Sequence, residues 1–431
     1  MPADKIPDDT QQKVKRYFGA GTYGIIIGCP RLPSDGETRA ELSTLPNSNN
    51  QVSKVIKDRD DIDKLTKIIK LINTKFCHDS LKLLQTQIAI PTPPQLINWY
   101  DLAKNPDELE FLKSHKITRR RTKWQYIMER GTSDLDVELR CVLTLNQFKH
   151  FLKGFENIIQ GVAALHTVGL VHTDLKLTNM IISWDGRYKL IDLDELGDAS
   201  ILPTNLYHYE KLFNNTYYPY YSPACVFLKV LPSAPVSEWG PSTSKVLFKT
   251  LIQKNYDKDY HKYFTDISQD VLKIADDSEL TRIIQGPHEN DQAMIDYLID
   301  FKDRLATQPN SNSAHRELLL FIDRYALGIN LLIILGKYYR LTGQIPIPTQ
   351  LQQQPSGNGG NNTENTCEFI PQNLIAIIKL CCNPKNYSAI TTQQIADEFR
   401  LFINSLFRRY PFKFIIKLLS GLVIRRRSIQ V

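Results

Sequence analysis

The chain has 431 residues, 42% apolar and 23% charged, so it is long enough for more than one packed core and too apolar for a mostly disordered protein. Its 53 basic and 46 acidic residues leave a net charge of +7, which favours anionic ligands without indicating nucleic-acid binding. Seven scattered cysteines include no C-x-x-C pair, which argues against a disulfide framework or a zinc site and favours a reducing compartment.

The N-terminus predicts a polar tail followed by a glycine-rich hairpin. Residues 1–15 are polar and of mixed charge, unlike a secretory signal. From Tyr17, "YFGAGTYGIIIGC" suits two strands joined by a loop with glycines in a G-x-G-x-x-G pattern. A dinucleotide site requires a helix directly after the third glycine, whereas "IIIGC" is a strand sequence. The loop is therefore expected to cover phosphates as a hairpin lid.

A strand and a helix are predicted after an inserted loop. Residues 33–50 are rich in turn formers and are expected to be exposed. "QVSKVIK" follows as a strand, in which alternation places Lys54 and Lys57 on opposite faces. Helical spacing in "DIDKLTKIIKLI" then predicts a helix.

The middle of the chain predicts a strand, a long helix and a hairpin. "KWQYIMERG" (123–131) reads as a strand ending in a loop, and "LNQFKHFLKGFENIIQGVAALHTVG" as an amphipathic helix closed by Gly169. Two short apolar runs, "NMIIS" and "YKLIDL", flank the turn "WDGR". Because antiparallel strands joined by a tight turn return the chain to its start, Asp192 is expected beside Asn179.

The remainder is predicted to be mainly helical. Residues 321–339 form a strongly apolar helix, although no run reaches the roughly eighteen uninterrupted apolar residues of a membrane span. Residues 343–366 are low in complexity and are expected to form a loop. The basic segment from Pro411 to the end carries apolar residues at helical spacing, which favours packing on the core over contact with an acidic membrane.

The residues of "HTDLKLTN" and "LIDLD" suit phosphoryl transfer, in which a protein mostly places the substrates and stabilises charge. Asp174 is a candidate to accept a hydroxyl proton, and Lys176 to contact the transferred phosphate. Asn179 and Asp192 offer oxygen ligands of the kind that Mg²⁺ prefers. Taken alone, Asp and Asn are also ordinary turn residues.

These two motifs, eighteen residues apart, resemble the catalytic loop and metal-binding segment of eukaryotic-type protein kinases. The resemblance implies Asp174 as catalytic base, Asn179 and Asp192 as Mg²⁺ ligands, and Lys176 as the phosphate contact of the Ser/Thr branch. "DRYALG" at 323–328 resembles the start of the central helix of the kinase C-lobe, where Asp323 would brace the catalytic loop's backbone. Small-molecule phosphotransferases share the Asp, Asn and Asp set but not this helix.

The resemblance also implies an ATP site. Lys54, with Val52 two residues before it, matches the lysine that anchors the phosphates, and "YIMERG" resembles the hinge beside the adenine. The nucleotide-binding residues implied are Gly19, Ala20, Gly21, Thr22, Tyr23, Gly24, Ile26, Lys54, Met128, Glu129 and Gly131.

Several family positions are altered. Thr173 replaces the arginine that usually grips a phosphorylated activation loop, and Ala224 replaces a glutamate whose arginine partner is also missing. Asp194 stands where the metal-binding triplet normally has glycine. No glutamate lies between residues 51 and 106 to pair with Lys54, which is the best argument for weak activity. Such losses and insertions are similar to those of divergent kinases encoded by large cytoplasmic DNA viruses, which would place the protein in the host cytoplasm or virion.

The sequence thus predicts an α+β, two-lobed kinase-like fold, with a β-rich N-lobe over 16–130 and a helical C-lobe over 131–431 that carries an insertion at about 225–315. The expected function is ATP- and Mg²⁺-dependent phosphorylation of Ser or Thr on a protein substrate. Two alternatives remain open: a small-molecule or lipid phosphotransferase of related fold, and a catalytically weak pseudokinase scaffold.

Overall fold

A computed structural model of the chain provides the coordinates, and the structural statements below concern the residues that it describes. These are residues 17–21, 24–28, 31–44, 50–56, 59–104, 106–114, 116–120, 124–199, 312–342, 364–383, 386 and 389–407.

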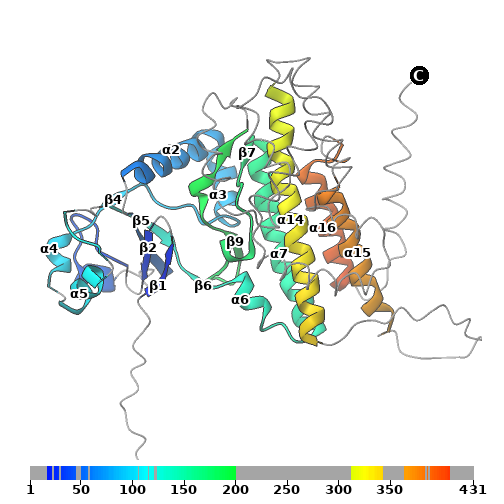
Figure 1. The fold of residues 1–431 in the computed structure, drawn as a ribbon, viewed down its shortest axis with the longest axis horizontal. Helices are drawn as coiled ribbons and strands as arrows, with labels where there is room; N and C mark the ends of the chain where they lie inside the picture. Colours follow the sequence, from blue (N-terminus) through cyan, green and yellow to red (C-terminus); the bar gives the residue numbers. More distant parts are fainter. Residues whose placement is uncertain are drawn as a thin grey trace, which may run out of the picture. The chain divides into compact units, whose positions relative to one another are not determined.

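The described residues form a mixed α+β fold (Figure 1). A five-stranded sheet has the order β1-β2-β3-β5-β4, a three-stranded sheet the order β6-β8-β9, and β10 pairs with β7. Strand pairs in the first and last of these sheets are antiparallel. The strands are β1 (Tyr17–Gly21), β2 (Gly24–Gly28), β3 (Gln51–Ile56), β4 (Gln95–Leu96), β5 (Trp124–Glu129), β6 (Gly131–Asp134), β7 (Leu170–Val171), β8 (Met180–Ser183), β9 (Tyr188–Leu190) and β10 (Gly197–Asp198).

Helices occur on both sides of the chain's midpoint. The α-helices are α1 (Arg39–Thr44), α2 (Arg59–Lys75), α3 (His78–Gln85), α4 (Trp99–Leu102), α5 (Pro106–Ser114), α6 (Leu135–Leu139), α7 (Leu145–Thr167), α14 (Asn312–Thr342), α15 (Glu364–Cys382) and α16 (Thr392–Phe407). Two 3₁₀ turns, η2 (Leu177–Asn179) and η3 (Leu193–Glu195), overlap the ends of "HTDLKLTN" and "LIDLD".

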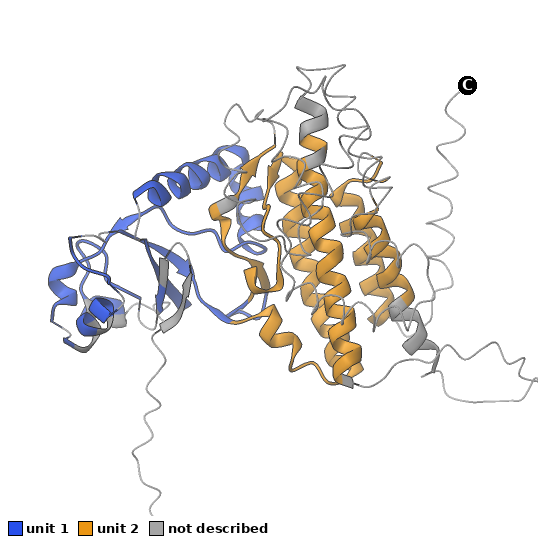
Figure 2. Ribbon diagram, viewed as in Figure 1, with its two compact units in different colours: residues 1–132, 182–187 blue, residues 133–181, 188–431 orange. Residues whose placement is uncertain are grey.

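The chain divides into two compact units (Figure 2). Unit 1 comprises residues 1–132 and 182–187, and unit 2 comprises residues 133–181 and 188–431. Each unit is described by itself below.

The structure confirms the elements that periodicity predicted. The predicted strands correspond to β1, β2, β3, β5, β8 and β9, and the predicted helices to α2, α7 and α14. Helix α14 begins at Asn312, before the predicted start at residue 321. The predicted loop over 343–366 is wrong at its end, because α15 begins at Glu364 and residues 364–366 are helical. Both helices start with polar turns that carry no apolar periodicity.

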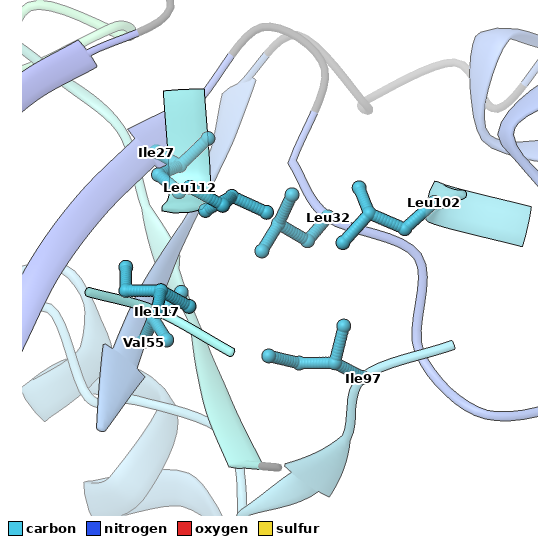
Figure 3. Close-up of a cluster of buried hydrophobic side chains, with 7 residues drawn as sticks. All are labelled: Ile27, Leu32, Val55, Ile97, Leu102, Leu112 and Ile117. Atoms are coloured by element: carbon cyan, nitrogen blue, oxygen red, sulfur yellow. The ribbon is translucent and has the colours of Figure 1, made fainter. Parts of the chain in front are cut away.

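The prediction of an exposed loop over residues 33–50 is wrong for its described part. Residues 39–44 form α1, Ser34 is buried and bridges to Ile97, and Leu42 is fully buried. Figure 3 shows the apolar cluster beside this segment, which combines side chains from β2 and β3, from the residues before α1 and from the residues that follow β4. Its members are Ile27, Leu32, Val55, Ile97, Leu102, Leu112 and Ile117.

A half-buried ion pair holds the start of this segment. The Arg31 guanidinium donates to both carboxylate oxygens of Glu37 at 2.9 Å each, and its Nε donates to Gln51 of β3 at 2.9 Å. These hydrogen bonds from Arg31 lower the pKa of Glu37 against the opposing effect of its burial. A bidentate pair of this kind fixes orientation as well as charge, so it ties the chain between β2 and β3 to the sheet.

The core of unit 2 is built around α14. Every residue from 321 to 339 is buried, α7 and α15 pack against this helix, and α16 packs against α7 and α15 (Figure 1). By length and composition alone, Leu319–Leu341 would be sufficient to cross a membrane, yet 94% of its most apolar window is buried inside the structure. A helix that is apolar all round suits the centre of a helical unit.

Glycine at position 154 allows β9 to sit on α7. A Cβ at Gly154 would lie 2.7 Å from ring atoms of Tyr188, which is closer than packed carbon atoms approach. One turn to either side, the Phe151 ring meets the Tyr188 ring edge-on and Asn157 Nδ2 donates to Tyr188 O at 2.8 Å. These contacts seat the strand that leads to Asp192.

We therefore predict that Gly154→Ala lowers the free energy of unfolding by about 1–3 kcal/mol through overpacking. At an open helix position the same change would raise stability by roughly 1 kcal/mol, so the sign is diagnostic. Denaturant unfolding measures it. The loss should shrink in a Tyr188→Leu background, and a Gly154→Ala variant at least as stable as the wild type would contradict this packing.

Candidate active site

The candidate active site of unit 2 centres on the carboxylate of Asp174, which Lys176 and Asn179 both contact. Lys176 Nζ lies 2.9 Å and 3.2 Å from the two carboxylate oxygens. Asn179 Nδ2 donates to the Asp174 carboxylate at 2.8 Å and to the Asp174 backbone oxygen at 2.9 Å. Because both amide hydrogens of Asn179 are used in this way, its Oδ1 faces away from Asp174 and is the atom suited to a cation.

The β8–β9 hairpin returns the chain to Asn179, as its sequence predicted. The turn is closed by a hydrogen bond from Gly186 N to Ser183 O at 2.9 Å, with Gly186 at φ 81°. After β9, Ile191 N donates to Asn179 O at 3.0 Å. Asp192 is the next residue and has a left-handed backbone, φ 62° and ψ 60°. Backbone pairing thus brings the segment of Asp192 beside that of Asn179.

His172 joins the loop to this hairpin. Its Nε2 lies 3.0 Å from Ile191 O, and its Nδ1 accepts from Asp174 N at 3.4 Å. A carbonyl oxygen only accepts, so Nε2 donates to Ile191 O while Nδ1 accepts from Asp174 N, and the ring bridges the two. One imidazole therefore contacts backbone groups next to both candidate acids.

Asp323 of α14 braces the backbone of the loop, as predicted. Its Oδ2 accepts from His172 N at 2.7 Å, and its Oδ1 accepts from Thr173 N at 2.8 Å. Thr173 has φ 66°, so the anchored peptide lies in the left-handed region. The expectation that 323–328 starts the helix is wrong, because α14 begins eleven residues before Asp323, at Asn312. A fully buried carboxylate requires such donors to offset its loss of hydration.

A third donor to Asp323 comes from His166, near the end of α7. His166 Nε2 lies 3.0 Å from Asp323 Oδ2, and its Nδ1 lies 2.6 Å from Thr392 Oγ1 at the start of α16. Burial lowers the pKa of His166 and outweighs the raising effect of the Asp323 carboxylate. The neutral ring therefore donates from Nε2 to Asp323 and accepts a hydrogen bond at Nδ1 from the Thr392 hydroxyl.

We predict that His166 makes the protein less stable in mild acid. As the pH falls below about 6.5, the unfolded chain protonates this histidine while the folded state resists, so folding stability drops by up to about 1.4 kcal/mol per pH unit. Unfolding of the wild type and of His166→Gln, measured between pH 8 and 5, tests this. The wild type should lose stability relative to His166→Gln below pH 6.5, whereas a relative gain would show that the buried ring is charged.

Sequence reasoning missed one polar residue that contacts the loop. Asn330 of α14 is fully buried, and its Nδ2 donates to Leu175 O at 3.0 Å and to Ala326 O at 2.7 Å. Its only sequence signal is an asparagine inside "ALGINLLIIL", seven residues after Asp323, which is two helical turns and hence the same face of the helix.

The predicted nucleotide-binding residues that the structure describes lie in unit 1. Lys54 of β3 is 8% exposed and pairs in register with Ile26 of β2 and Tyr126 of β5. Tyr126 Oη donates to Ile62 O of α2 at 2.9 Å, so this face of the sheet is the one that α2 covers. The acidic residues of α2 are aspartates in and near its first turn, in keeping with the missing glutamate.

The hinge-like and glycine-rich residues also lie on this sheet or directly after it. Met128, of which 9% is exposed, pairs with Val52, and Glu129 pairs with Gln51 and accepts a hydrogen bond from Ser183. Gly131 begins β6. Gly19, Ala20 and Gly21 lie in β1, and Gly24 and Ile26 lie in β2, with Gly21 opposite Gly24.

Some predicted features lie outside the described residues. These are Thr22 and Tyr23 of the glycine-rich motif, Lys57, the polar tail 1–15, Ala224, residues 225–311 of the predicted insertion, residues 343–363 of the low-complexity segment, and the basic C-terminus from Pro411.

No protein-family model matches the chain. A nitrogen permease reactivator protein of Saccharomyces cerevisiae is 36% identical over 107 residues, which are 24% of this chain and 12% of that protein. A dual serine/threonine and tyrosine protein kinase is 33% identical over 96 residues in Homo sapiens, covering 21% of this chain and 10% of that protein. Its counterpart in Gallus gallus is 28% identical over 144 residues, covering 29% and 15%.

The chain therefore spans only about an eighth of the length of these relatives. The matches indicate a partial similarity to protein kinases, on a mixed α+β fold. They lend no support to a viral origin.

Proposed function

We propose that this protein is an ATP-dependent protein kinase that transfers the γ-phosphate of ATP to Ser or Thr hydroxyl groups, on a two-lobed kinase fold. The observation that carries the proposal is the double contact of Lys176 and Asn179 with the Asp174 carboxylate, on a loop whose backbone Asp323 anchors. The anchoring helix favours a protein kinase over a small-molecule phosphotransferase, since the latter class lacks it. The partial similarity to named protein kinases points the same way.

In this proposal Asp174 acts as the general base. The hydroxyl oxygen of the substrate attacks the γ-phosphorus, its proton passes to the Asp174 carboxylate, and the bond from the γ-phosphorus to the bridging oxygen breaks to release ADP. Lys176 lies beside Asp174 and so supplies positive charge where the phosphoryl oxygens gain negative charge. The left-handed Thr173 and the Asp323 anchor hold the base in one orientation before substrate arrives.

The residues present fit a magnesium ion. Asn179 Oδ1 and the Asp192 carboxylate are hard oxygen donors, and the hydrogen bonds of Asn179 leave its oxygen turned from Asp174. When bound, Mg²⁺ would neutralise charge on the nucleotide phosphates. The proposal assigns nucleotide binding to the glycine hairpin, Lys54 and the Met128–Gly131 segment of unit 1.

Phosphate transfer from labelled ATP tests the proposal, with autophosphorylation and a generic protein substrate as acceptors. We expect Asp174→Asn to reduce the rate by about 10²–10⁴-fold, because the general base is lost. Asp192→Asn should also reduce the rate strongly and raise the Mg²⁺ concentration required. The matched control is Asp185→Asn, an exposed carboxylate in the turn of the same hairpin, which should change the rate by less than about twofold.

The acceptor decides among the alternatives. Transfer to sugars, amino alcohols or lipids in place of protein would identify a small-molecule or lipid phosphotransferase. Nucleotide binding without any transfer would identify a pseudokinase scaffold. Phosphate incorporation unaffected by either Asp174→Asn or Asp192→Asn would overturn the catalytic assignment itself.

A further inference from the structure

Asn330 is a polar residue in the most apolar stretch of the described chain. Each residue from 321 to 339 is buried, and Asn330 is 0% exposed. Its Nδ2 donates to Leu175 O and to Ala326 O, so the two amide hydrogens fix the orientation of the side chain. Its Oδ1 has no hydrogen-bond partner among the described residues.

This arrangement is costly for stability alone. A buried amide oxygen without a donor loses its hydration and gains nothing in return. Asparagine is also a poorer helix former than the leucine and isoleucine residues around it. Where a residue breaks the local rule of a core, the compensation is expected in function.

The cost of burying Asn330 is offset by its hydrogen bond to the loop that carries Asp174. Leu175 lies between Asp174 and Lys176, and it is buried. The neighbouring carbonyl oxygens have donors from within the loop, because Asn179 Nδ2 donates to Asp174 O and Asn179 N donates to Lys176 O. Leu175 O instead receives its hydrogen bond from Asn330, which belongs to another element.

Asp323 and Asn330 of α14 form hydrogen bonds with the backbone on both sides of Asp174. Asp323 accepts from the N–H groups of His172 and Thr173 before it, and Asn330 donates to the carbonyl of Leu175 after it. The two residues are seven apart, so both project from one face of the helix. Fixing peptide groups on both flanks restricts rotation of the backbone at Asp174.

We propose that Asn330 is a positioning residue, which fixes the direction of the Asp174 and Lys176 side chains by holding the Leu175 carbonyl. Its effect on catalysis rests on the proposed kinase function, whereas its effect on the order of the loop does not. Asn330 touches neither substrate nor nucleotide in this account and acts through the loop.

The test compares Asn330→Leu and Asn330→Ala with the wild type in the full-length protein. Hydrogen exchange of the loop amides, residues 172–179, is expected to quicken by about tenfold in both variants, while the amides of α14 keep their protection. The rate constant kcat for phosphate transfer should fall about tenfold to a hundredfold with KM for ATP nearly unchanged. Asn330→Leu should melt at or near the wild-type temperature, because it also removes the unsatisfied Oδ1.

The matched control is Ile329→Val, which deletes one buried methylene from the same helix. It should lower the melting temperature slightly and leave both loop exchange and kcat unchanged. This result would show that kcat depends on the hydrogen bond from Asn330 to Leu175 and not on the stability of α14.

Each result has one meaning. Loop exchange unchanged in both Asn330 variants, or faster exchange of α14 and the loop together, would overturn the positioning role. A wild type without phosphate transfer would refute the proposed function, while faster loop exchange in the Asn330 variants would still support the anchor.

Discussion

The arrangement of unit 2 depends on the buried carboxylate of Asp323. A carboxylate that is 0% exposed must be satisfied by donors, and its three partners come from the end of α7 and from the loop that follows, both far from Asp323 in the sequence. Two backbone N–H groups of the loop and the neutral ring of His166 meet this need. One electrostatic requirement thus fixes α14, the end of α7 and the candidate catalytic loop relative to one another.

From this anchor the candidate site follows by short local steps. Gly169, at φ 79°, turns the chain after α7 into β7 and the loop, and Asp174 then lies between peptide groups held by α14. The β8–β9 hairpin packs on α7 and returns the chain to Asn179, so that Asp192 follows directly after the residue that pairs with Asn179. The candidate catalytic residues therefore lie on a few neighbouring segments that one helix, α14, braces. This explains why so polar a loop can be buried and ordered.

Much of this could be predicted from the sequence, because strong signals carried it. The 3.6-residue periodicity of α7, the tight turn at Gly186 and the strongly apolar run of α14 each indicate one structure clearly. The short helices α1 and α3–α5 could not be predicted, because they are short and lie among turn-forming residues. The burial of Ser34 and Leu42 could not be predicted either, because it depends on packing with residues far away in the sequence. Asn330 also escaped prediction, because a hydrogen bond to a backbone carbonyl leaves no motif.

The central claim is that Asn179 and Asp192 serve one divalent ion bound with a nucleotide. Selective ¹⁵N labelling of asparagine and aspartate, with Mn²⁺ and a non-hydrolysable ATP analogue, tests it through paramagnetic broadening. The account predicts that the amide signals of Asn179 and Asp192 broaden together, at the same Mn²⁺ concentration and only when the analogue is present. Broadening of neither signal, or of one without the other, would contradict it.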